Sequence, residues 1–163
     1  MEERGVLTTC KLRTYEAPLL SDMNIRDARI LNKVIMKSEW LREAFEELDK
    51  TTESVTFLVS PEAPYLRISA VGITGSTELD YPRDADIIDS FQCEQTQINS
   101  YRLSMVQACA HALTASSKTS LRTNEHGFLS LQFMIPVDDG QISFVEFLMS
   151  PLDVGSGTAG SER

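Results

Sequence analysis

The sequence is short of the residues from which metal centres and disulfide frameworks are built. It has only three cysteines, Cys10, Cys93 and Cys109, and two histidines, His111 and His126. The cysteines are odd in number, lie far apart and form no C-x-x-C motif, so we expect buried free thiols. Neither histidine lies in a recognisable nucleophile elbow or catalytic triad. We expect no metal and no cofactor.

Long apolar runs are also absent. No run of about 18 apolar residues occurs, which predicts that the chain has no membrane span and no membrane partner. The start, Met1–Gly5, lacks the apolar stretch of a signal peptide, so we expect a cytosolic or nuclear chain. Hydrophobic residues make up 42% of the 163 residues and charged residues 24%, which is typical of one soluble globular domain.

Basic residues are outnumbered by acidic ones. The 15 lysines and arginines face 24 aspartates and glutamates, which gives a formal net charge of −9. Phosphate contacts need clustered Lys and Arg, so this balance excludes a protein that binds nucleic acid through its overall charge. Any contact with DNA must be local.

The hydrophobic pattern predicts the same order of elements twice. A β-rich stretch over 29–36 precedes a helix with Ser38 as its N-cap, and a stretch over 91–103 precedes a helix with Ser104 as its N-cap. Three short strands follow each helix, over 54–60, 65–73 and 76–81 and then over 119–123, 127–136 and 141–149. A β-α-β-β-β unit written twice predicts an α+β fold, an antiparallel sheet with two helices on one face.

Three aspartates form a candidate catalytic cluster. Asp84, Asp86 and Asp89 follow Pro82 between two expected strands, and a metal-dependent nuclease needs acidic ligands close together. Aspartate is also common in turns, and this position favours solvated turn carboxylates.

Three large apolar residues lie in an irregular segment. Neither helical nor strand periodicity explains Leu19, Leu20 and Met23, since residues 15–27 show no sustained hydrophobic pattern and contain Pro18. They either line a groove or fix this connecting segment to the core.

Several short motifs resemble one known family. They are Ser38-Glu39-x-Leu41-Arg42-Glu43-Ala44-Phe45-x-Glu47-Leu48-Asp49, Leu79-Asp80-Tyr81-Pro82, Cys93-x-Gln95-Thr96-Gln97, Gly127-Phe128-Leu129-Ser130-Leu131-Gln132, Asp139-Gly140-Gln141-Ile142 and Phe144-Val145-Glu146. Over about residues 5–151 the chain resembles the Rad-one subunit of the nine-one-one checkpoint clamp. That family is PCNA-like and has two clamp domains per subunit.

The resemblance implies a domain organisation and a non-enzymatic function. Residues 28–151 are expected to form the C-terminal clamp domain, 1–14 the last strand of a missing first domain and 15–27 the connector between them. Residues 152–163 are expected to form a disordered tail. The implied function is that of a nuclear heterotrimeric sliding clamp, which is loaded on damaged DNA and recruits checkpoint signalling and repair proteins. Its implied partners are two other clamp subunits, a clamp loader, double-stranded DNA in the ring channel and client peptides.

The resemblance also assigns candidate site residues. Clamp helices line the channel, so Arg42 is the expected DNA-facing residue. A client groove is expected from Leu19, Leu20, Met23, Leu148, Ser150 and Pro151. The expected subunit interface is the strand Ser76, Thr77, Glu78, Leu79, Asp80 and Tyr81, and the strand over 141–149 is expected to pair with the first domain.

Two alternatives remain open at this point. Members of the family have been described as 3'-5' DNA exonucleases, for which Asp84, Asp86 and Asp89 are the candidate residues. The chain could also be an interaction module that acts without DNA.

Overall fold

The structure is a computed structural model, and it describes residues 28–83, 86–137 and 140–152 and, before residue 28, only residues 2–3, 6–7, 9 and 11. The two short N-terminal strands β1 (Glu2–Glu3) and β2 (Val6–Leu7) pair antiparallel. Most of residues 1–14, expected to form the last strand of a first domain, lie outside the described residues, as do the whole connector over 15–27 and the tail from residue 153 on.

The main body follows the expected order, with one strand more. Its elements are β3 (Ile30–Lys37), α1 (Ser38–Glu47), β4 (Ser54–Val59), β5 (Leu66–Val71), β6 (Ser76–Tyr81), β7 (Ile88–Cys93), β8 (Gln97–Arg102), α2 (Leu103–Gln107), α3 (Ala110–Ala115), β9 (Lys118–Asn124), β10 (Leu129–Pro136) and β11 (Ile142–Met149). The expected α+β class is confirmed, and none of the described helices is long and apolar enough to cross a membrane.

The strands of this body form two antiparallel sheets where the sequence predicted one. The first has the order β11-β10-β9-β3-β7 and the second the order β6-β5-β4-β8. The difference arises in the stretch over 91–103, which bends at Glu94–Thr96. As a result β7 pairs with β3 in the first sheet, whereas β8 pairs with β4 in the second.

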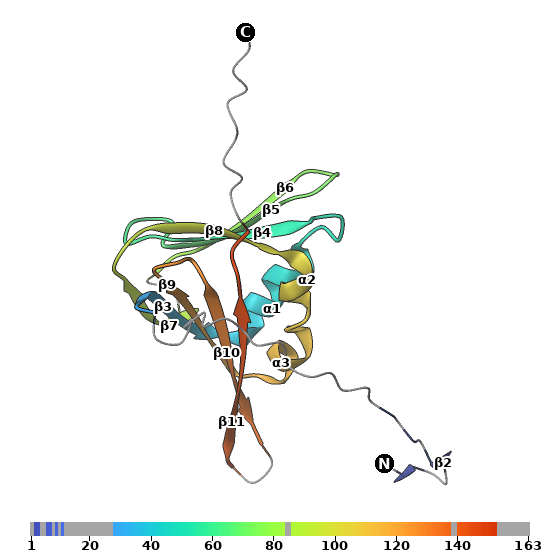
Figure 1. Ribbon diagram of the computed structural model, residues 1–163. Helices are drawn as coiled ribbons and strands as arrows, with labels where there is room; N and C mark the ends of the chain where they lie inside the picture. Colours follow the sequence, from blue (N-terminus) through green and yellow to red (C-terminus); the bar gives the residue numbers. More distant parts are fainter. Residues whose placement is uncertain are drawn as a thin grey trace.

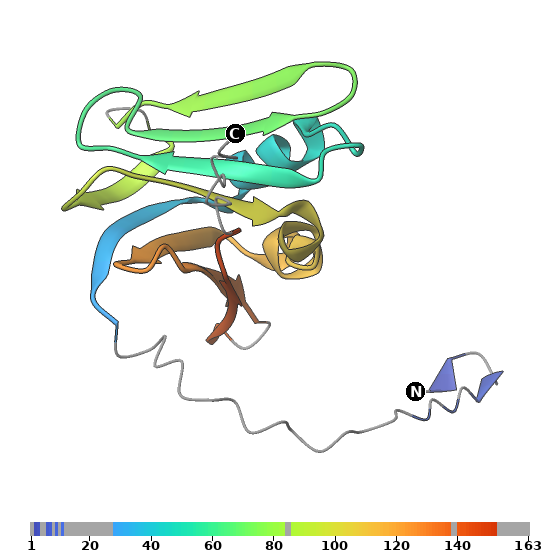
Figure 2. The same cartoon turned by 45° about the horizontal axis from the view of Figure 1, so that its top comes forward.

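The helices lie side by side on one side of the two sheets (Figures 1 and 2). One core joins all these layers: it contains Val34 and Leu121 from the first sheet, Phe57 and Ile68 from the second, and Leu41 from α1. Alternating side chains produce this core, because every second residue of a strand points to the same face.

Both N-cap predictions are wrong, that of Ser38 by one residue and that of Ser104 by two. Lys37 and Arg102 are the capping residues, and neither makes a side-chain cap bond. Ser38 is instead the first helical residue, and its buried Oγ lies 2.8 Å from Thr119 Oγ1 and accepts a hydrogen bond of 2.7 Å from Ser116 Oγ. Its hydroxyl therefore joins α1 to β9 and to the end of α3. The second expected helix is also divided, into α2 and α3.

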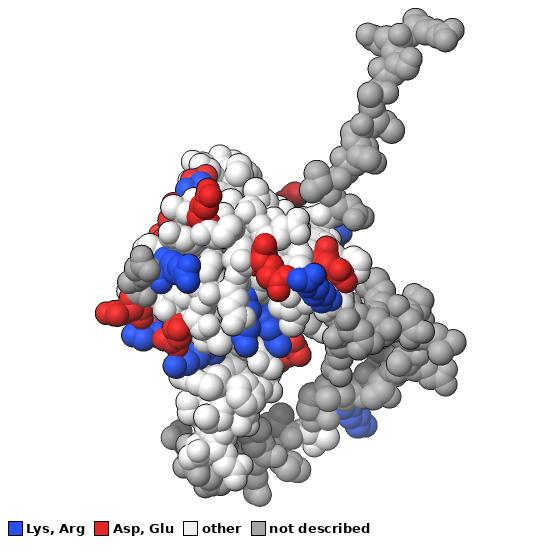
Figure 3. Space-filling view, turned by 90° about the vertical axis from the view of Figure 1, so that its left-hand side faces the viewer, with Lys and Arg blue, Asp and Glu red and all other residues white. Residues whose placement is uncertain are grey.

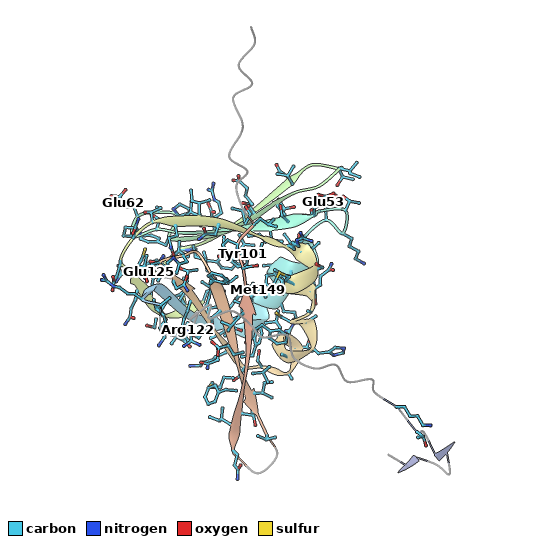
Figure 4. The ribbon with its side chains drawn as sticks, in the orientation of Figure 1. Glu53, Glu62, Tyr101, Arg122, Glu125 and Met149 are labelled. Atoms are coloured by element: carbon cyan, nitrogen blue, oxygen red, sulfur yellow. The ribbon has the colours of Figure 1, made fainter. Side chains whose placement is uncertain are left out.

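Two of the recognised motifs hold the sheets together. Gln97 of β8 donates from Nε2 to the backbone oxygen of Asn124 at 2.9 Å, and its Oε1 accepts from Asn32 and Thr123 of the first sheet. Tyr101 lies between the sheets (Figure 4), and its hydroxyl donates to the backbone oxygen of Gly127 at 2.7 Å. Gly127 has a φ of +78°, and a Cβ there would meet Asn99 Oδ1 at 2.7 Å, so both conformation and space require glycine.

Candidate partner-binding site

The expected acidic cluster is not assembled in the described part of the chain. Asp89 Oδ2 lies 2.8 Å from Lys118 Nζ and is engaged in that ion pair, Asp86 is exposed, and Asp84 lies outside the described residues. Within the described ranges no three His, Cys, Asp or Glu side chains come together as metal ligands would.

The two described cysteines are free thiols. Burial raises the pKa of the Cys109 thiol to about 12, and burial also raises the pKa of Cys93. Such thiols are largely protonated near neutral pH and are poor nucleophiles. Cys10 lies outside the described residues.

Arg42 lies on α1, half-buried, beside a small cavity between α1 and the pair α2–α3. Phe45, Leu103, Val106 and Leu113 form apolar walls of this cavity of about 150 Å³. Arg42 makes no ion pair with any carboxylate of the described residues. Its guanidinium is therefore available, and contact with DNA stays a prediction.

The strand expected at the subunit interface is an edge strand. β6 ends the second sheet and pairs only with β5, over the whole of Ser76–Tyr81. Arg67 of β5 binds the carboxylates of this strand, with Nε 2.6 Å from Asp80 Oδ1 and Nη1 3.1 Å from Glu78 Oε2. The hydrogen bond from Arg67 lowers the pKa of Asp80. These charges are thus paired with β5, and the backbone edge beyond β6 is open within the described chain.

The other expected pairing strand, β11, ends the first sheet and is unusually apolar. Its exposed large residues are Ile142, Phe144, Val145 and Leu148, with Phe144 61% exposed. The described part of the β10–β11 hairpin extends away from the body (Figure 1), and its projecting end is white in Figure 3. The one charged residue of β11, Glu146, is paired with Arg122. Soluble monomers rarely present an apolar edge of this kind, because its free backbone groups can pair with another strand.

The expected client groove is described only in part. Leu148 lines a cavity of about 400 Å³ at the end of the first sheet, which we call the Leu148 cavity. Ile30 and Phe128 form further apolar walls, and Thr123, Asn124, Arg122, Ser130 and Glu146 form polar ones. Ser150 and Pro151 directly follow β11, whereas Leu19, Leu20 and Met23 lie outside the described residues. Ile30, which begins β3, follows the expected connector over 15–27 by three residues.

A polar bridge crosses three strands beside the Leu148 cavity. Arg122 Nη2 of β9 donates to Glu146 Oε1 of β11 at 2.8 Å and to Ser130 Oγ of β10 at 3.2 Å. The Ser130 hydroxyl in turn donates to Glu146 Oε1 at 2.6 Å. Figure 4 places Arg122 on the first sheet, away from Tyr101 in the core. No sequence pattern identifies Arg122 or Asn124 as site residues. The Gly127–Gln132 motif contains Phe128 and Ser130, which line the Leu148 cavity. In the sequence alone, that motif contributes only to the family resemblance and does not assign these residues to a site.

The comparisons with known proteins agree with this fold. Residues 1–135 match the family model described as repair protein Rad1/Rec1/Rad17. The human protein named cell cycle checkpoint protein RAD1 is 47% identical over 151 residues, which cover 93% of this chain and 54% of the human one. The Schizosaccharomyces pombe protein named DNA damage checkpoint control protein rad1 is 35% identical over 156 residues, with 95% of this chain and 48% of the yeast chain covered.

A third relative carries an enzyme name. The Mycosarcoma maydis protein named DNA repair exonuclease REC1 is 27% identical over 206 residues, with 95% of this chain and 44% of the fungal chain covered. The chain spans about half the length of the curated relatives it matches. The family model covers most of the chain, and the α+β clamp fold expected for that family is the fold observed. This chain belongs to the Rad1/Rec1/Rad17 family of repair proteins.

Proposed function

We propose that this chain acts in the nucleus as part of a subunit of a heterotrimeric DNA-damage checkpoint clamp, which is loaded on damaged DNA and recruits checkpoint and repair proteins. The observation that carries the proposal is that two of the four edge strands of the main body, β6 of one sheet and β11 of the other, differ in chemistry. A ring is closed by head-to-tail contacts between clamp domains, so each domain must offer two different surfaces. In this proposal residues 28–151 are the C-terminal clamp domain, β6 pairs with the next subunit, and β11 pairs with a first clamp domain.

The DNA contact in this proposal is weak and local. Arg42 is the only basic residue on α1, the described residues of α2 and α3 include no Lys or Arg, and the net charge is −9. So few basic residues can make only a few phosphate contacts, and these supply little affinity for DNA. A clamp needs no more than this, because a ring closed by a loader around double-stranded DNA is retained by its topology.

A co-assembly experiment tests the ring proposal. The full chain is mixed with each cognate checkpoint-clamp subunit, and the mass of the product is measured by sedimentation. Along an edge strand, every second backbone N–H points away from the sheet, and proline has no N–H. One of the two variants Thr77→Pro and Glu78→Pro therefore removes an outward-pointing donor and keeps the β5–β6 hydrogen bonds. The variant that keeps its melting temperature should lose co-assembly. Co-assembly that survives in this folded variant would refute the role of β6.

We further propose that client peptides bind an apolar groove formed by Leu19, Leu20 and Met23 of the connector with Leu148, Ser150 and Pro151. Its support is that Leu148 is 40% exposed and lines the Leu148 cavity with Ile30 and Phe128. Leu148→Asp and the double variant Leu19→Asp, Leu20→Asp should weaken binding of a client peptide. Undiminished affinity in both variants would contradict the groove.

The alternative function is that of a DNA exonuclease. It is favoured by the name of the fungal relative, DNA repair exonuclease REC1. The test combines purified chain, labelled single-stranded DNA and a divalent metal. Our proposal expects no degradation. Metal-dependent degradation that is lost in Asp86→Ala would establish the alternative. A module that acts without DNA remains as a third possibility, and a client complex that forms without any clamp subunit or DNA would favour it.

A further inference from the structure

One strand carries half of the buried polar side-chain atoms that lack a hydrogen-bond partner among the described residues. Those on β9 are Ser120 Oγ, Arg122 Nε and Asn124 Nδ2. The three residues alternate along the strand and therefore face the same side of the first sheet, opposite to the buried Leu121 and Thr123. An unpaired buried donor is costly, so three on one face indicate a surface that gains hydrogen bonds when a partner binds.

The Asn124 amide is fixed in orientation. Its Oδ1 accepts hydrogen bonds of 3.0 Å from the backbone N–H groups of both His126 and Phe128, and Asn124 as a whole is only 4% exposed. Nδ2 is therefore the free end of the side chain, and it can only donate.

Two cavities open over this face of β9. The Leu148 cavity is lined by Arg122 and Asn124, and a second one of about 360 Å³, the Phe144 cavity, is lined by Ser120. The bridge from Arg122 to Glu146 lies between them. Together they form what we call the β9 trough, with apolar walls from β3 on one side of β9 and from β11, beyond β10, on the other. These walls are Ile30 and Ile35 of β3 and Phe144 and Leu148 of β11.

The charge on this face is opposite to that of the whole chain. The basic residues of the outward-facing positions are Lys33, Lys37, Lys118 and Arg122, and the acidic ones are Asp89 and Glu146. Asp89 is paired with Lys118 and Glu146 with Arg122. Lys33 has no ion pair among the described residues. On a chain of net charge −9 this local excess of cations selects for acidic ligands.

We propose that the β9 trough binds an extended peptide of a partner protein in which acidic or amide side chains alternate with apolar ones. The inference rests on the proposed recruitment function and names the chemistry of the recruited segment. Residues two apart in a strand are about 6.6 Å apart, and an extended peptide repeats its side chains at the same interval. Its acceptors can thus match Ser120, Arg122 and Asn124 in turn, while its apolar residues contact Phe144 and Leu148. Rotation of the surrounding cavity side chains, the commonest kind of change on binding, gives the peptide access to the shielded donors, while the Asn124 amide keeps its orientation.

The test uses short random peptides displayed on phage and selected on the full chain. The enriched peptides should be rich in Asp and Glu, and the affinity of the strongest, measured by fluorescence anisotropy, should fall as salt rises. Asn124→Asp keeps the Oδ1 acceptor that orders the 124–128 turn but replaces the donor with a charged acceptor. It should weaken binding at least about tenfold, as should Lys33→Glu.

Two further variants separate binding from folding. Ser120→Ala removes a hydroxyl that has no partner among the described residues, so it should fold normally and bind about threefold more weakly. Lys50→Glu makes the same charge change as Lys33→Glu in the turn after α1 and should bind as the original chain does.

The remaining outcomes overturn the proposal in distinguishable ways. Selected peptides that respond to Leu148→Asp but not to Asn124→Asp, Ser120→Ala or Lys33→Glu would refute the trough and leave the client groove standing. Displacement of the selected peptide by a synthetic peptide of residues 12–27 would identify the connector of this chain as the occupant instead. Failure to select any peptide would refute the trough, while co-assembly with clamp subunits would still decide the proposed clamp function.

Discussion

At the scale of single residues, the hydrogen bond of the Tyr101 hydroxyl links the second sheet to the turn between β9 and β10 of the first. Tyr101 is fully buried, its ring packs edge-on against Phe57, and its hydroxyl is bound to the backbone oxygen of Gly127. Tyr101→Phe leaves that oxygen buried and unpaired, so the free energy of unfolding should fall by about 1–3 kcal/mol. Urea unfolding measures this free energy. The matched control is Tyr65→Phe, because the Tyr65 hydroxyl makes no hydrogen bond among the described residues. An equal decrease in the free energy of unfolding in both variants would contradict the role of the Tyr101–Gly127 hydrogen bond.

Asp49 should make the stability depend on pH in the acid range. Hydrogen bonds from the Thr74 side chain and from Thr51 lower its pKa from 3.8 to about 2. The carboxylate is therefore favoured in the folded state. Its stabilising effect is complete above about pH 3.8 and is lost as pH falls from there to about 2. The melting temperature of Asp49→Asn should lie below that of the original chain near neutral pH, and the gap should close in acid. A gap that stays constant would contradict this assignment.

At the scale of elements, alternation made most strands predictable. The expected ranges 54–60, 65–73 and 76–81 agree closely with β4, β5 and β6, because one face of each strand meets the core. The stretch over 91–103 was predicted as one strand and forms two, β7 and β8. Its β-rich composition does not indicate that the chain passes from one sheet to the other within it. The N-caps were misjudged because Ser38 uses its hydroxyl in contacts with Thr119 and Ser116, which lie far away in the sequence.

For the candidate site, the resemblance to the clamp family was the source of the prediction. It assigned Leu148 to a client groove, which stays a prediction, and Leu148 lines a cavity in the structure. The Arg122–Ser130–Glu146 bridge was not foreseen, because its members come from three strands whose register is set by the whole sheet. An orphaned donor such as Asn124 Nδ2 likewise has no signature in sequence. The assignment of Leu19, Leu20 and Met23 to the client groove remains a proposal.

The apolar edge β11 should cause self-association of the isolated chain. Phe144 and Val145 are exposed on an edge whose backbone groups are open within the described chain. We expect light scattering to show an average mass that rises with protein concentration, and Phe144→Lys should reduce this rise because an edge lysine opposes strand addition. Gln107→Lys adds the same charge on α2 and should have no effect. A monomer at all concentrations would contradict this prediction.

At the scale of the whole molecule, the two open edges belong to different sheets and differ in chemistry. β6 presents polar side chains whose carboxylates are held by Arg67, whereas β11 presents Phe144, Val145 and Leu148. A contact between two unlike edges of this kind is head-to-tail and not twofold symmetric. The proposed clamp follows from this asymmetry, and the excess of acidic residues is compatible with it because a closed ring needs little affinity for DNA.

The most direct test of the clamp proposal is hydrogen exchange in the full chain, alone and mixed in turn with each cognate checkpoint-clamp subunit. An added strand gives new acceptors to the outward N–H groups of an edge. With one of the subunits, amides within Ser76–Tyr81 should exchange more slowly, while those of β4, an interior strand, should keep their rates. Unchanged exchange over Ser76–Tyr81 with every subunit would contradict the proposal that this chain contributes β6 to a checkpoint clamp.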